Sequence, residues 1–92
     1  MIPYLLVWMF SFVLPIQQPQ TDSLKRMAAQ TDNDSIKASS LYNLSKLYYT
    51  YDPDTAILYA TEAKEISIKR GFQKMQANSL NIIGVSFLIK SE

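Results

Sequence analysis

The sequence predicts an all-α fold in which antiparallel helix pairs stack as the beginning of a solenoid. One segment occurs twice, because Ala38–Tyr48 reappears as Ala77–Phe87, 39 residues further along the chain. A period between about 20 and 50 residues is typical of stacked supersecondary units. Apolar residues recur at helical spacing, and only two of the 92 residues are Gly. Together these features predict a helical region over residues 21–92.

The composition excludes several kinds of chemistry. The chain has no Cys and no His, so it cannot form a disulfide and lacks the commonest general base and metal ligand. A net charge of +1 gives no field that would attract nucleic acid. The acidic pairs in Asp32–Ser35 and Asp52–Asp54 are explained by helix capping, because neither has the Gly and distal Glu of a calcium loop. We therefore expect no enzyme, no metal and no cofactor.

The first 20 residues differ in kind from the rest. Residues 1–20 contain no Asp, Glu, Lys or Arg, and residues 4–14 form an almost wholly apolar run between Pro3 and Pro15. A membrane-spanning helix needs about 20 apolar residues, and shorter runs of this kind are typical of signal peptides. We predict a signal peptide or short hydrophobic leader, and an exported protein that is periplasmic or membrane-associated. A retained membrane anchor and a buried segment are the alternatives.

Two helices are predicted directly after the leader. The first spans about residues 21–29, where Thr21 or Asp22 can cap the free backbone N–H groups. The second spans about residues 33–50 and contains the first copy of the repeat. The apolar stripe of the first helix consists of Leu24, Met27 and Ala28, and that of the second of Leu41, Leu44, Tyr48 and Tyr51. Both stripes follow the spacing of an amphipathic helix.

Two further helices have clear boundaries. The helix at about 53–70 has Asp52 as its N-cap and Pro53 in its first turn, and Gly71 fits its left-handed end. Its small residues, at helical spacing, are Ala56, Ala60 and Ala63. The helix at about 73–90 is apolar on every side, which is normal for a buried helix, yet the chain stops before anything could cover it. We therefore expect a truncated product whose last helix exposes an apolar face and can self-associate.

The repeated segment and its neighbour resemble the tetratricopeptide repeat family. That family pairs two antiparallel helices through Trp-x2-Leu-Gly-x2-Tyr in the first helix and Ala-x3-Phe, then Ala, in the second. The matching positions are Leu41, Leu44, Ser45, Tyr48, Ala56, Ala60 and Ala63 in the first unit, and Leu80, Ile83, Gly84 and Phe87 in the second. The resemblance covers about one and a half repeats, and it implies that these residues pack between paired helices.

The leader, the Thr-Asp-Ser-Leu-Lys-Arg helix and the long repeat period are also similar to the exported N-terminal regions of Bacteroidetes sensor histidine kinases and related regulators. This resemblance implies a non-enzymatic protein–protein interaction module at the sensory end of a bacterial signal-transduction protein. The alternative is a free-standing secreted or membrane-anchored scaffold with no kinase connection. The sequence does not name the partner.

Tetratricopeptide arrays usually bind extended peptides on the surface lined by the first helix of each repeat. The resemblance places five polar or aromatic residues there, namely Tyr42, Lys46, Tyr49, Asn78 and Asn81. We expect them to contact a protein or peptide partner, and the alternative is an ordinary solvated helix face. Lys46 is the only cation among them, so the sequence does not support the Lys/Asn clamp with which some family members hold a terminal carboxylate.

Overall fold

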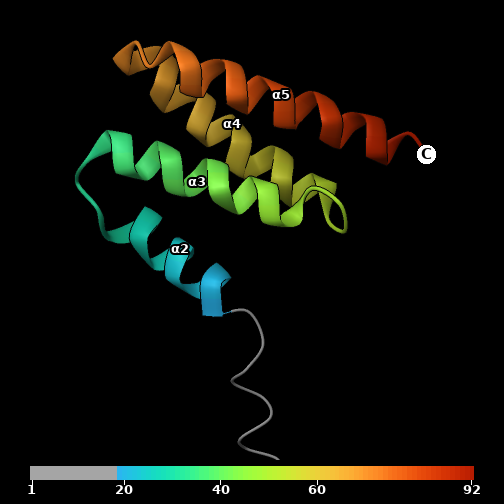
Figure 1. Ribbon diagram of the computed structural model, residues 1–92, viewed down its shortest axis with the longest axis horizontal. Helices are drawn as coiled ribbons and strands as arrows, with labels where there is room; N and C mark the ends of the chain where they lie inside the picture. Colours follow the sequence, from blue (N-terminus) through green and yellow to red (C-terminus); the bar gives the residue numbers. More distant parts are fainter. Residues whose placement is uncertain (1–18) are drawn as a thin grey trace, which may run out of the picture.

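The computed structural model describes residues 19–92, and four α-helices make up most of that stretch (Figure 1). These helices are α2 (Pro19–Gln30), α3 (Asp34–Tyr48), α4 (Pro53–Arg70) and α5 (Gln73–Lys90). No strand occurs between residues 19 and 92, which confirms the predicted all-α fold class.

The leader predicted at residues 1–20 lies outside the described stretch, apart from Pro19 and Gln20 in the first turn of α2. The apolar run at 4–14 therefore also lies outside it. Among the helices from residue 19 onward, none has the length and apolarity needed to cross a bilayer.

Side-chain caps explain where α3 and α4 begin. The Asn33 side chain accepts a hydrogen bond from a backbone N–H in the first turn of α3 at 3.1 Å. Asp52 accepts from the backbone N–H and from the hydroxyl of Thr55, at 3.3 and 2.7 Å. Pro53 occupies the first turn of α4, where its missing N–H would have no helical partner. In contrast, α5 follows Phe72, which makes no side-chain cap hydrogen bond.

The helix ends have equally local causes. α3 ends at Tyr48, two residues before the predicted end, because the backbone N–H of Asp52 turns back to the Tyr48 carbonyl at 2.7 Å. After α4, Gly71 adopts a left-handed conformation with φ 74°, which a residue without Cβ enters at no steric cost. The Phe72 N–H then donates to the Ser67 carbonyl at 2.9 Å and closes the end of the helix.

The helices form a curved array in chain order (Figure 1). α4 packs against both α3 and α5 and runs antiparallel to each of them. α3 and α5 therefore point the same way, and they touch each other over a shorter stretch. Because α2 packs on α3, α3 has a helix on two sides, whereas α5 lies at the end of the array.

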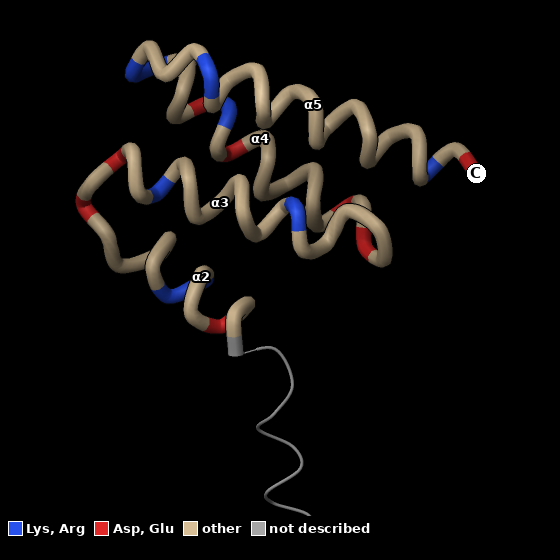
Figure 2. Tube along the Cα trace, in the orientation of Figure 1, with Lys and Arg blue, Asp and Glu red and all other residues tan. Residues whose placement is uncertain are grey.

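Two ion pairs join the end of one helix to the start of the helix before it. Figure 2 marks the positions of the charged residues along the chain. Arg70 Nε, in the last turn of α4, lies 2.5 Å from Asp34 Oδ2 in the first turn of α3. Lys90 Nζ, in the last turn of α5, lies 2.6 Å from Asp54 Oδ1 in the first turn of α4. Each acid and each base lies at the helix end that its charge complements, so the helix dipoles add to both contacts.

Small residues fill most of the core. Four alanines are at most 1% exposed, namely Ala38, Ala56, Ala60 and Ala63. Ala63 packs in one cluster with Ala28 and the buried Leu41 and Leu44. Three buried serines donate to the carbonyl three or four residues earlier at 2.6 to 2.7 Å, namely Ser45, Ser67 and Ser86. This local bonding lets hydroxyls lie inside the helix contacts without an unsatisfied donor. Ser79, also fully buried, has no hydrogen-bond partner among the described residues.

Candidate functional site

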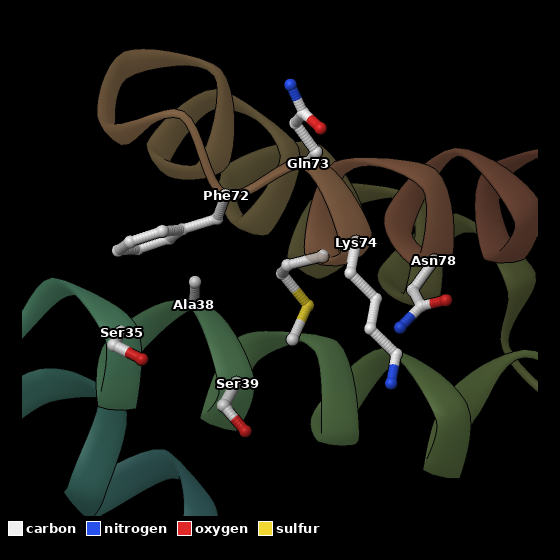
Figure 3. Close-up of a pocket in the computed structure, with 8 residues that line it drawn as sticks. Ser35, Ala38, Ser39, Phe72, Gln73, Lys74 and Asn78 are labelled. Atoms are coloured by element: carbon white, nitrogen blue, oxygen red, sulfur yellow. The ribbon is translucent and has the colours of Figure 1, made fainter.

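A groove of about 480 Å³ lies between the N-terminal halves of α3 and α5 (Figure 3). Its lining residues are Ser35, Ala38 and Ser39 from α3, and Phe72, Gln73, Lys74, Met75 and Asn78 from the start of α5. The two serines are one helical turn apart, as are Lys74 and Asn78, so each helix presents two polar side chains on one face. Figure 3 shows the Phe72 ring above Ala38, with Lys74 and Asn78 reaching toward the α3 side of the groove.

The groove combines an apolar floor with polar edges. Ala38 is 1% exposed and Phe72 is half-buried, whereas Lys74 is exposed. No carboxylate lines the groove, and within residues 19–92 Lys74 takes part in no ion pair. The hydroxyls of Ser35 and Ser39 and the amide of Asn78 can each donate and accept hydrogen bonds. Such a surface can pair with the backbone of an extended chain and with a carboxylate near Lys74.

Of the five residues predicted to contact a partner, Asn78 lines this groove. Tyr42 and Lys46 lie further along the same face of α3, and the Lys46 Nζ is 5.1 Å from the centroid of the Tyr42 ring. Tyr42 also packs against the core through its half-buried side. Tyr49, half-buried, is the C-cap of α3, and Asn81 is exposed one turn beyond Asn78.

Sequence reasoning missed four polar members of the groove, Ser35, Ser39, Gln73 and Lys74. Lys74 precedes Asn78 by one turn, so the spacing of Lys74, Asn78 and Asn81 was the available signal for a common face. Lys46 is therefore not the only cation on this side of the molecule. Ser35 and Ser39 could not be singled out from the sequence, because serines are also common on helix faces that contact only water.

The residues predicted to pack between repeat helices lie in two different environments. In the first unit, all are buried except the half-buried Tyr48: Leu41, Leu44, Ser45, Ala56, Ala60 and Ala63. In the second unit, Leu80 is 50% exposed, Phe87 is 53% exposed, Gly84 is exposed and Ile83 is half-buried. The face that α5 buries contains Ser79, Ile82 and Ser86 instead. No helix within residues 19–92 covers the other face of α5.

A second hollow, of about 330 Å³, lies where α2 meets α3 and α4. At its edge, the Lys25 Nζ is 5.8 Å from the centroid of the Tyr48 ring, and hydrogen bonding to Tyr48 raises the pKa of Lys25. The Tyr48 ring also lies 5.8 Å from the Tyr59 ring and 5.4 Å from the Tyr51 ring, between centroids. Partial desolvation raises the pKa of Tyr51. The Lys25–Tyr48 contact joins α2 to α3, and the Tyr48–Tyr59 contact joins α3 to α4.

No group of three His, Cys, Asp or Glu side chains in residues 19–92 is placed to hold a metal ion. Comparison with family models, with curated proteins and with solved structures finds no match to this chain. The side chains of the groove are therefore the features from which a function can be inferred.

Proposed function

We propose that this chain is a non-enzymatic interaction module of tetratricopeptide-like architecture that holds an extended acidic peptide between α3 and α5. The observation that carries the proposal is the groove, in which hydroxyls, an amide and an ammonium without a carboxylate partner border an apolar floor. The antiparallel α3–α4 pair, followed by α5 in the direction of α3, supports the solenoid assignment.

The chemistry of the groove favours one kind of peptide. An extended chain offers backbone N–H and C=O groups that cannot bond to each other, and the side chains of Ser39 and Asn78 can satisfy them. Lys74 adds a positive charge with no acid beside it, so a carboxylate side chain on the peptide would find a partner there. Phe72 and Met75, both half-buried, offer apolar contact to a small side chain of the peptide. Tyr42 and Lys46 continue this surface along α3.

The test is a titration of the full-length chain, followed by backbone amide NMR shifts, with an extended acidic peptide as the probe. We expect shifts at the groove residues with the acidic peptide and none with a basic peptide of equal length. Lys74→Ala and Asn78→Ala should each weaken binding several-fold, because they remove a charge-assisted or amide hydrogen bond. Lys69→Ala is the matched control, since Lys69 is an exposed lysine of α4 outside the groove. Equal binding of both peptides would contradict the proposal.

The cellular setting is a second part of the proposal and rests on the sequence resemblance. We infer that the chain is the exported, sensory end of a bacterial signal-transduction protein, and the alternative remains a free-standing scaffold. A fusion of residues 1–20 to a reporter enzyme that is active only after export tests the location. Activity of the fusion supports export, and an inactive but expressed fusion would contradict it.

A further inference from the structure

α5 leaves one face uncovered along its whole length. The exposed positions on this face are Ala77, Leu80, Asn81, Gly84, Phe87, Leu88 and Ser91. Three of them are large apolar residues, with exposed fractions of 50% for Leu80, 53% for Phe87 and 67% for Leu88. An apolar stripe of this kind on a soluble helix marks a surface that is stabilised when another helix packs on it.

The order of side-chain sizes along the stripe says which helix fits. Small residues recur every seven positions, at Ala77, Gly84 and Ser91, and the large residues Leu80 and Phe87 lie between them, also seven apart. A seven-residue repeat with alternating steps of three and four keeps a seam facing a neighbouring helix. The stripe therefore offers knobs and recesses at the same spacing, so it can pack against a copy of itself.

Only one direction of pairing matches knobs to recesses. In a parallel, in-register pair, Leu80 would face Leu80 of the second copy, and the two glycines would face each other across a gap. In an antiparallel pair that crosses at the level of Ile82, Leu80 faces Gly84 of the second copy and Phe87 faces Ala77 of the second copy. Twofold symmetry repeats both contacts, so each large side chain meets a small one.

Gly84 provides an independent observation. Its helical backbone does not need glycine, because Gly71 is the glycine with positive φ. A Cβ atom built on Gly84 would meet nothing within 4 Å, so no neighbour in this chain requires the missing side chain. Glycine weakens the middle of a helix relative to alanine. A second backbone that approaches closely at this point would explain its presence.

We propose that two copies of this chain associate through antiparallel packing of the exposed faces of their α5 helices. The seam from Ala77 to Phe87 is about 15 Å long, at 1.5 Å per residue. That is a small interface, because a stable dimer usually buries about 800 Å² on each partner. The association should therefore be weak and depend on concentration in the micromolar range. It does not depend on the proposed peptide groove.

The test is sedimentation of the full-length chain over a range of concentrations. We expect a monomer–dimer equilibrium that Gly84→Leu weakens by roughly tenfold or more, because the new side chain fills the recess for Leu80 of the second copy. Helicity at low concentration should not fall, since position 84 has open space in the monomer. Leu58→Glu is the control, because Leu58 is 67% exposed and belongs to α4, not to the seam. It should leave association unchanged.

Single cysteines test the direction of packing, since the chain has none of its own. In the antiparallel pair the two copies of Asn81 lie close together, whereas the two copies of Ser91 are about 27 Å apart along the helices. Asn81→Cys should therefore cross-link on oxidation and Ser91→Cys should not. Cross-linking at both positions would overturn the antiparallel arrangement. A monomer at every concentration, or association that ignores Gly84→Leu and thus uses another surface such as the leader, would overturn the proposal.

Discussion

The two copies of the repeated segment are identical at Ala38/Ala77, Ser40/Ser79 and Leu41/Leu80, but their surroundings differ. Leu41 is 3% exposed, whereas its counterpart Leu80 is 50% exposed. Ala38 is buried and Ala77 is exposed. The difference follows from the neighbours, because α3 lies between α2 and α4, while α5 packs on α4 and only on one end of α3. Burial is thus decided by what lies beside a helix and not by its own side chains.

One pair of equivalent positions does not follow this contrast. Ser40 and Ser79 are both buried, at 2% and 0% exposed. Ser40 lines the contact with α2, the helix that precedes α3. Ser79 lies on the face that α5 buries, which is directed mainly at the preceding helix α4. Each copy is therefore covered by the helix before it, and only the first copy also has a helix after it.

Truncating the equivalent leucines should give the largest difference between the copies. Leu41→Ala is expected to lower the free energy of unfolding by about 2 to 5 kcal/mol, because it leaves a cavity in the core. Leu80→Ala should cost less than about 1 kcal/mol, since half of that side chain is already in water. Urea unfolding followed by circular dichroism in dilute solution measures both.

Leu41→Met is the control for the case in which Leu41→Ala does not fold. It keeps the volume of the buried side chain and should cost less than about 1.5 kcal/mol. Equal losses for Leu41→Ala and Leu80→Ala would show that the second copy is as well covered as the first.

Replacing the equivalent small residues by leucine should change the free energy of unfolding in opposite directions in the two copies. Ser45 is fully buried, so Ser45→Leu should lower the free energy of unfolding by about 1 to 3 kcal/mol through overpacking. Gly84→Leu should instead raise it by up to about 1 kcal/mol, because leucine favours the helix and meets open space. Thermal melts at low protein concentration compare the two. A loss of stability for Gly84→Leu in the monomer would mean that α5 is covered within one chain.

Replacing the buried serines of α5 by alanine should change the free energy of unfolding by a smaller amount. Ser79→Ala should raise the free energy of unfolding by about 1 kcal/mol, because it removes a buried hydroxyl that has no partner in residues 19–92. Ser86→Ala is the matched control, since that hydroxyl donates to the Ile82 carbonyl at 2.7 Å. The control should be neutral or slightly destabilising. If both variants were stabilised equally, helix propensity alone would account for the result.

The ion pairs should give the smallest effect. Arg70→Gln should lower the free energy of unfolding by less than about 1 kcal/mol, and added salt should reduce that loss. Lys90→Gln should cost less still, because its partner Asp54 is 73% exposed and Asp34, the partner of Arg70, only 32%. Unfolding at low and high salt measures both pairs. A salt-independent loss would point to packing of the long side chains rather than to charge.

The part of the fold that could be predicted from sequence is the part with local causes. Asp52, Pro53 and Gly71 specify where α4 begins and ends through caps within a few residues, and the structure places these caps as expected. The end of α3 was predicted two residues too late, because the turn back to the Tyr48 carbonyl depends on the chain that follows. α2 starts at Pro19, inside the predicted leader.

The groove was less accessible to sequence reasoning. Asn78 was named in advance, but Ser35, Ser39 and Lys74 join it only because α3 and α5 cross near their N-termini. Tyr42 and Lys46 were expected among five partner-contacting residues, and the structure adds that the Lys46 Nζ lies over the Tyr42 ring. The position and angle at which two helices cross decide which of their side chains share a groove. Neither can be predicted from the sequence of one helix alone.

By itself, the sequence determined that residues 21–92 are largely helical, where α3 and α4 are capped, and that one helix type occurs twice. These properties depend on hydrogen bonds and dihedral preferences that reach no further than one or two turns. Only the tertiary structure decided that Leu41 is core and Leu80 is surface, and that Lys74 borders the groove. Such properties depend on which helices lie side by side, since removal from water requires a neighbour.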